Sequence, residues 1–359
     1  MKKLLMSLVC LFALVALVAC GQTNNTEEPT PAAAQYKLGL GTEVGLKGGE
    51  SSAEINATVA AVVLDKDGKI LACRLDVAQN KISTEDGAIT KLDYARTKME
   101  KGTDYGMSNP NYYAPDNDGD GRVLEWDAQA KAFEEFIKGM TATEVAAMTT
   151  QTLESGYVIS NNEDLLAAGC TIQIDEFKAA VVKACNDEQG VTFDAAENFT
   201  LGLAITSFEE GKADAEDENG FVKIASDMAA SVVVNGKIAA SLNDAIQTEF
   251  TISAEDYSLT AKTFPGTKRE RKTGYGMSNP AYNAPDADGD GRILEWNEQS
   301  LAFSKHVVGM TGEQVANMET AKNSINYDMT TDSELLAAGC TIQITAIKAV
   351  VAKSVTNAR

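Results

Sequence analysis

The chain has 359 residues, and its 52 acidic residues outnumber its 31 basic residues, which gives a formal net charge of −21. An acidic surface of this size repels nucleic acid and anionic lipid headgroups, and it favours cations as partners. The cysteines show neither a CxxC motif nor the Cys/His spacing of a zinc site. We expect four of them to be small buried apolar residues: Cys73, Cys170, Cys185 and Cys340.

Residues 1–20 are typical of a secretory signal, because two lysines precede an apolar stretch that is too short to span a membrane. The stretch ends in Leu17-Val-Ala-Cys-Gly21, which resembles the lipobox of bacterial lipoproteins. The resemblance implies that Cys20 becomes a lipidated N-terminus, which would anchor the chain on the extracytoplasmic face of a cell membrane. Residues 21–35 are polar and without apolar periodicity, and they predict a disordered tether.

The rest of the chain contains one module written twice. Tyr105-Gly-Met-Ser-Asn-Pro110 recurs as Tyr275-Gly-Met-Ser-Asn-Pro280, and no gap is needed from there to Thr171 and Thr341. Further upstream, Asp76-x-x-Gln79 corresponds to Asp244-x-x-Gln247. The repetition predicts two tandem domains, a first repeat at residues 36–188 and a second repeat at residues 191–359.

Each repeat places strands before helices, which predicts an α+β fold. The β-branched segments on either side of Asp67-Gly68 predict a hairpin, and Asn235-Gly236 predicts its counterpart in the second repeat. Apolar residues at helical spacing predict a helix from Trp126 that ends at Gly139. A capping box at Thr141 and Glu144 opens another, and Thr311 with Gln314 repeats it. The final helix of the first repeat is expected at residues 175–185.

An acidic segment in each repeat resembles an EF-hand loop. Alternate acidic positions, a glycine at position 6 and a backbone carbonyl at position 7 fit a calcium site, in which the glycine allows the sharp turn. Position 12 departs from the usual Glu, so we expect weak affinity, and Glu125, Glu295 or Glu298 are alternative ligands. The expected ligands are Asp116, Asp118, Asp120, Arg122 and Asp127 in the first repeat, and Asp286, Asp288, Asp290, Arg292 and Asn297 in the second.

The ends of each repeat resemble the FMN-binding domain family of extracytoplasmic electron-transfer proteins. The resemblance rests on Asp67-Gly-Lys-Ile70, on Ala168-Gly-Cys-Thr171 and on Ala338-Gly-Cys-Thr341, each of the last two followed by a helix rich in Lys, Ala and Val. It implies that FMN is esterified to Thr171 and Thr341. Two positions depart from the family's motif, namely Ala168 and Ala338 before the glycine and Cys170 and Cys340 after it. The alternative interpretation is a tight turn capped by the threonine.

The sequence contains no hydrolase, nucleotide-binding or metalloprotease motif. We therefore expect a non-enzymatic, calcium-stabilised lipoprotein with a binding or structural task, and the alternative is an FMN-carrying electron carrier. The shared Tyr105 and Gln79 either line a site or serve turns and caps. The single histidine, His306, has a phenylalanine as its counterpart and is expected to be packed rather than catalytic.

Overall fold

Two antiparallel sheets organise the chain, and each is formed mainly by one half of the sequence. In the computed structural model the first sheet has the strand order β4-β3-β2-β1-β7, and the second has the order β11-β10-β9-β8. The structure describes residues 34–107, 124–154, 156–195, 198–277, 294–322 and 326–359. The predicted signal, its Cys20 and nearly all of the predicted tether lie outside these residues.

The elements of the first half begin with four strands and continue with helices. β1 begins at Ala34, slightly before the Tyr36 expected from the sequence. Their bounds are β1 (Ala34–Lys47), β2 (Ser52–Leu64), β3 (Ile70–Glu85), β4 (Ala88–Asp93), α1 (Lys98–Lys101), η1 (Gly102–Tyr105), α2 (Trp126–Phe136), α3 (Ala142–Ala146), β5 (Thr150–Thr152), β6 (Val158–Ser160), α4 (Glu163–Ala167) and α5 (Asp175–Cys185).

The second half runs through the same order of elements after one additional strand, β7, which pairs with β1 and so belongs to the first sheet. The bounds are β7 (Val191–Ala195), β8 (Thr200–Ala213), β9 (Gly220–Val234), β10 (Lys237–Ile252), β11 (Leu259–Ala261), α6 (Lys268–Arg271), η2 (Lys272–Gly274), α7 (Trp296–His306), α8 (Gly312–Ala316), β12 (Thr320–Lys322), β13 (Asp328–Thr330), α9 (Ser333–Ala337) and α10 (Thr345–Thr356). Helices combined with antiparallel sheets confirm the α+β class.

The predicted hairpins and helices agree with this structure, except that α2 ends at Phe136, before the expected end at Gly139. β2 and β3 pair on either side of Gly68, and β9 and β10 pair on either side of Asn235-Gly236, where both turn residues have positive φ. The capping boxes at Thr141 and Thr311 are both formed. The helix predicted at residues 175–185 is α5, with these same bounds.

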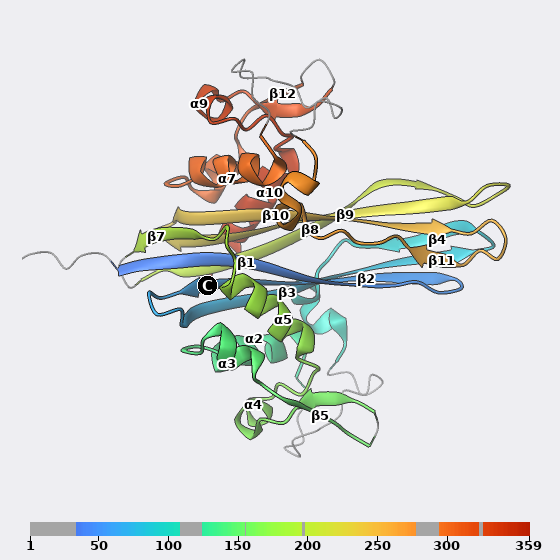
Figure 1. Ribbon diagram of the computed structural model, residues 1–359, viewed down its shortest axis with the longest axis horizontal. Helices are drawn as coiled ribbons and strands as arrows, with labels where there is room; N and C mark the ends of the chain where they lie inside the picture. The colour runs from blue at the N-terminus through green and yellow to red at the C-terminus, as the bar shows by residue number, and fades with distance from the viewer. Residues whose placement is uncertain (1–33, 108–123, 155, 196–197, 278–293, 323–325) are drawn as a thin grey trace, which may run out of the picture. The chain divides into compact units, whose positions relative to one another are not determined.

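The central strands β2 and β9 are buried on both faces along most of their length. Ala57, Val59, Ala61 and Val63 of β2 belong to a core cluster that also contains residues of the second sheet. The intervening residues Ala60, Val62 and Leu64 pack against α2 and α5 instead. A third cluster joins the second sheet to α7 and α10. The order is therefore helices, sheet, sheet, helices, and the helices lie on the outer faces in Figure 1.

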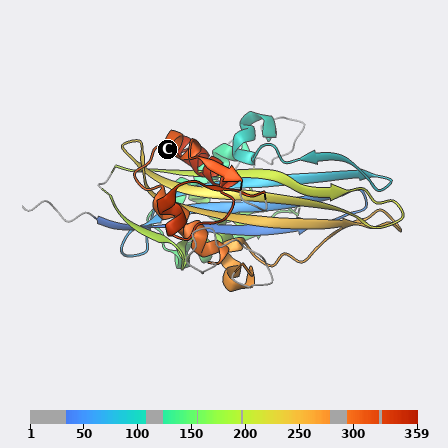
Figure 2. The same cartoon turned by 90° about the horizontal axis from the view of Figure 1, so that it is seen from above.

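The central cluster draws on residues of both repeats, and contacts join Ala33–Arg359 into one compact unit. The long strands of both sheets run along one direction in the two views (Figure 1, Figure 2). Helix α5 approaches β1 most closely at Gly39, where an added Cβ would overlap the carbonyl oxygen of Ala184. Gly202 has the same relation to Ser354 of α10. In the part of the chain that the structure describes, no helix is long and apolar enough to cross a membrane.

Candidate functional site

The shared aspartate of β3 fixes the start of α1. Asp76 is buried and its carboxylate accepts hydrogen bonds from the backbone N–H groups of Val77 (2.7 Å) and Met99 (3.0 Å). Thr97 caps α1 in a capping box with Glu100, so Lys98 becomes the first helical residue. Burial raises the pKa of Asp76 to about 7, although its hydrogen bonds with Thr97 and the two N–H groups act in the opposite direction.

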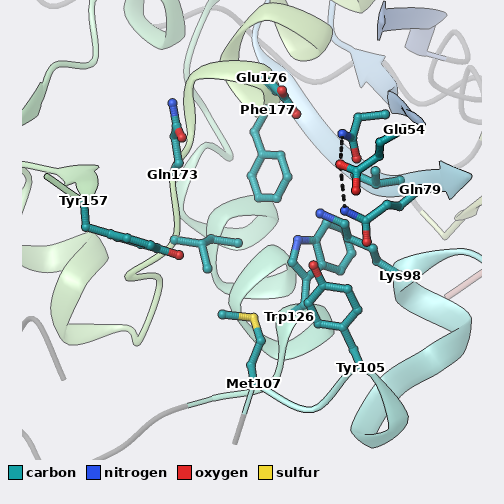
Figure 3. Close-up of a pocket in the computed structure, with 13 residues that line it drawn as sticks. Glu54, Gln79, Lys98, Tyr105, Met107, Trp126, Tyr157, Gln173, Glu176 and Phe177 are labelled. Atoms are coloured by element: carbon teal, nitrogen blue, oxygen red, sulfur yellow. Dashed lines mark hydrogen bonds between the residues drawn. The ribbon is translucent and has the colours of Figure 1, made fainter. Parts of the chain in front are cut away.

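Lys98, at the start of α1, projects into a cavity of about 430 Å³ between β2, β3, α1, α2 and α5. Figure 3 shows Trp126, Tyr105 and Phe177 on its walls, with Lys98 beside Gln79 and Glu54. The volume lies in the range of small-molecule sites. The cavity is lined by Glu54, Asn56, Val77, Gln79, Lys98, Tyr105, Met107, Trp126, Tyr157, Ile172, Gln173, Glu176 and Phe177.

The ammonium of Lys98 rests against aromatic rings instead of pairing with a carboxylate. Its Nζ lies 5.3 Å from the ring centroid of Tyr105 and 5.6 Å from that of Trp126, which is cation–π distance. Among the described residues, no carboxylate oxygen lies within the 4.0 Å of an ion pair from this nitrogen. Burial lowers the pKa of Lys98, and the charges of Glu176 and Glu54 offset part of the effect.

Two carboxylates line the same cavity from β2 and α5. Glu54 accepts hydrogen bonds from Asn56 and from Gln79 (3.2 Å), and its other oxygen is 3.6 Å from Lys81. Burial favours a higher pKa for Glu54, but these neighbours outweigh it and lower the pKa. Glu176 accepts a hydrogen bond from the hydroxyl of Thr58 at 3.1 Å. The cavity therefore presents a positive group and negative groups on different walls.

The threonines considered as flavin acceptors are part of the buried framework. Thr171 is 4% exposed, and both its N–H (2.8 Å) and its hydroxyl (3.2 Å) donate to Oε1 of Gln129, which is itself fully buried. Thr341 makes the same two bonds to Gln299, at 2.7 and 3.1 Å. In each repeat these bonds tie the segment before the last helix to the helix that begins at the tryptophan. A transferase would have to open this contact to reach the hydroxyl.

Most of the predicted calcium ligands lie outside the described residues: Asp116, Asp118, Asp120, Arg122, Asp286, Asp288, Asp290 and Arg292. Elsewhere in the described chain, no group of three or more His, Cys, Asp or Glu side chains is placed to hold a metal ion.

The residues at position 12 of the two predicted loops lie within the described chain. Asp127 pairs with Lys131 at 2.7 Å. Asn297 donates to Gln189 at 3.1 Å, and its buried Oδ1 has no hydrogen-bond partner within the described residues. These two groups are placed differently, so the two loops are not equivalent at their ends.

Two further glutamates join the ends of the acidic loops. Glu125 is buried and accepts a hydrogen bond from the N–H of Met107 at 3.0 Å, and Glu295 accepts one from Met277 at the same distance. Each bond connects the residue before an acidic segment to the residue that precedes the next helix. Two of the alternative calcium ligands, Glu125 and Glu295, therefore already accept a backbone hydrogen bond, and the third, Glu298, accepts one from the N–H of Glu295 at 2.9 Å.

The cysteines and the histidine are packed as expected from the sequence. All four described cysteines are buried free thiols, and burial raises the pKa of Cys170 and of Cys340 to about 12. His306 has a side chain that is 13% exposed, and its Nε2 lies 3.5 Å from Asp332. None of these groups lines the cavity.

Sequence reasoning identified Tyr105 and Gln79 as possible site residues but did not single out Lys98, Glu54 or Glu176. A signal for the lysine is present, because Thr97-Lys-Met-Glu100 recurs as Thr267-Lys-Arg-Glu270. No family model matches the chain, and comparison with curated proteins and with solved structures finds no significant match. The assignment of this site therefore depends on the chemistry of its residues alone.

Proposed function

We propose that the protein is a non-enzymatic binding protein whose first repeat holds a small polar molecule in the cavity beside Lys98. The observation that carries this proposal is the ammonium of Lys98, which has no carboxylate at ion-pair distance among the described residues, lies over two aromatic rings and faces the carboxylates of Glu54 and Glu176. Keeping a partly buried charge without a direct counterion costs free energy. A ligand that supplies the missing partner would recover that cost.

The composition of the cavity supports binding over catalysis. Among its described lining residues there is no serine, threonine, cysteine or histidine. The Ser–His and Cys–His pairs that activate a hydroxyl or thiol nucleophile are therefore lacking among these described residues. Glu54 is committed to hydrogen bonds with Asn56 and Gln79, which suits a fixed recognition group.

We place this binding protein on the outer face of a cell membrane, held by lipid on Cys20, and we propose that it consists of two repeats of one module. Calcium in the two acidic loops would fix the starts of α2 and α7. The bonds from Glu125 to Met107 and from Glu295 to Met277 support this, because they bring together the two ends of each loop.

The test is calorimetry on the purified full chain and on Lys98→Met, with a panel of amino acids, dipeptides and neutral sugars. Wild type is expected to bind at least one compound, and Lys98→Met is expected to weaken that binding by about 10- to 100-fold, since one charge-assisted hydrogen bond is lost. Lys66→Met is the matched control, because Lys66 is exposed and its ion-pair partner among the described residues is its neighbour Asp67. The proposal would be overturned if no compound of the panel binds to wild type, or if Lys98→Met and Lys66→Met weaken binding equally.

A further inference from the structure

The second repeat carries most of the residues that form the cavity of the first. Eight of the thirteen lining residues are identical at the corresponding positions, and they include Gln247, Lys268, Tyr275 and Trp296. Four of the five positions that differ carry a smaller side chain in the second repeat: Ala225, Ala245, Ala346 and Ile347. These replacements remove side-chain volume at four of the corresponding positions.

Lys268 is held as its counterpart is. Thr267 caps α6 in a capping box with Glu270, and Asp244 accepts hydrogen bonds from the N–H groups of Ala245 (2.7 Å) and Arg269 (3.0 Å). The Nζ of Lys268 lies 5.4 Å from the ring centroids of both Tyr275 and Trp296. Within the described residues this ammonium also lacks a carboxylate at ion-pair distance.

The carboxylates are present in both repeats but at different positions. Lys223 stands where the first repeat has Glu54, and Ala346 stands where it has Glu176. In their place the second repeat has Glu210, at a bulge of β8, and Asp227 on β9. Both oxygens of Glu210 accept hydrogen bonds from Gln247, at 2.8 and 3.0 Å, as Glu54 accepts one from Gln79.

Each repeat therefore combines one lysine over two rings, one glutamine bonded to a glutamate, and a second carboxylate. No carboxylate of one set has a counterpart at the same position in the other. If the acids served only to neutralise the lysine, direct ion pairs would be the most stable arrangement, and neither lysine has one among the described residues. The recurring arrangement, with charges of both signs kept apart, fits recognition of a ligand that has both charges.

We propose that the second repeat holds a second binding site, at Lys268, and that both sites bind a small zwitterion with an ammonium group and a carboxylate group. The ligand's carboxylate accepts from the lysine, and its ammonium donates to the two acids. This inference rests on the proposed function and extends it from one site to two and from a polar molecule to a zwitterion.

The experiment is a calorimetric titration of the full chain with free L-amino acids, with glycylglycine and with glucose as the neutral comparison. We expect two molecules bound per wild-type chain, one per chain in Lys98→Met and in Lys268→Met, and none in the double variant. Because Lys268→Met could disturb folding, Glu210→Gln is measured as well, since it changes an exposed carboxylate without removing volume. It is expected to weaken the second site by about 10-fold.

The outcomes separate this inference from the proposal on which it rests. One bound molecule per wild-type chain, lost in Lys98→Met and unchanged in Lys268→Met and Glu210→Gln, overturns the second site and keeps the proposed function. Binding of glucose but of no amino acid or dipeptide, if it is lost in Lys98→Met, overturns the zwitterion and keeps the cavity. Binding of no compound overturns both.

Discussion

A buried ion pair joins the two repeats, and its removal gives a sharp test of their packing. Asp187, which follows α5, lies against Arg269 of α6, and the two side chains are 8% and 6% exposed. The Nη2 of Arg269 is 3.1 and 3.2 Å from the two carboxylate oxygens. The same oxygens accept hydrogen bonds from the N–H of Leu40 on β1 (3.1 Å) and of Gln189 (2.9 Å).

The change Asp187→Asn removes the charge and turns one of these accepting oxygens into a donor. One backbone N–H then faces an amide NH₂ group, and the guanidinium of Arg269 stays buried without its counterion. Breaking a buried pair in this way costs about 3–5 kcal/mol of unfolding free energy. For a protein with an ordinary stability of about 5–15 kcal/mol, this is a large fraction of the total.

The assay is urea unfolding of wild type, Asp187→Asn and Asp104→Asn. Asp104 pairs with Arg96 at 2.7 Å, but these side chains are 65% and 51% exposed, so the loss of this pair is expected to cost only about 0–1 kcal/mol. If Asp187→Asn costs no more than Asp104→Asn, the pair does not hold the repeats together and this reasoning fails.

Four further predictions follow from the same structure. Burial raises the pKa of Asp76 from 3.8 to about 7, so the folded chain holds the proton of this carboxyl more tightly than the unfolded chain does. The contribution of this proton to the free energy of unfolding is therefore full below pH 3.8 and is lost as the pH rises through 7. Between acid and neutral pH, the free energy of unfolding of Asp76→Asn should therefore rise by up to about 4 kcal/mol relative to that of wild type in urea titrations. A difference between the two proteins that does not change with pH would contradict this. Calcium should raise and chelator lower the melting temperature of wild type, whereas a variant with Asp116→Asn and Asp286→Asn should respond to neither; an unresponsive wild type would contradict the calcium loops. Mass spectrometry after coexpression with a flavin transferase should show no added FMN, because the hydroxyl of Thr171 is buried and bonded, and a flavin-sized increase would refute this. A fragment of residues 36–188 should aggregate or remain unfolded in gel filtration and circular dichroism, since it exposes the central core, and a monomer that melts cooperatively would show the opposite.

The sequence predicted local elements well because their signals are local. The turn at Asn235-Gly236 and the capping boxes at Thr141 and Thr311 need only a few neighbouring residues, and all are present in the structure. The arrangement of the sheets was not predictable in this way. The apolar run of β2 does not alternate, because one face meets the other sheet and the next meets α2 and α5. Nothing within that run identifies its two partners.

The site illustrates the same limit. Tyr105 and Gln79 could be identified from the sequence because the same residues recur in the second repeat. Glu54 and Glu176 could not, since the second repeat has Lys223 and Ala346 at these positions. Their importance depends on distances between β2, α5 and α1 that sequence spacing does not contain. The shared Asp76 holds the backbone of α1, a role that depends on contact between β3 and a later helix.

The position of the site within the layers accounts for this divergence. The inner faces of the two sheets form one core, so a change at Val59 or Ala61 of β2 acts on residues of both repeats at once. Gln79 and Lys98 instead belong to the helix-covered side of the first sheet, and the described residues that line the cavity there all come from the first repeat. A substitution at these lining positions changes the first repeat's cavity without changing the central core, which fits the placement of the carboxylates on β2 and α5 in one repeat and on β8 and β9 in the other. We infer that the shared core preserves the fold, whereas the outer faces carry the positions at which the two proposed sites differ.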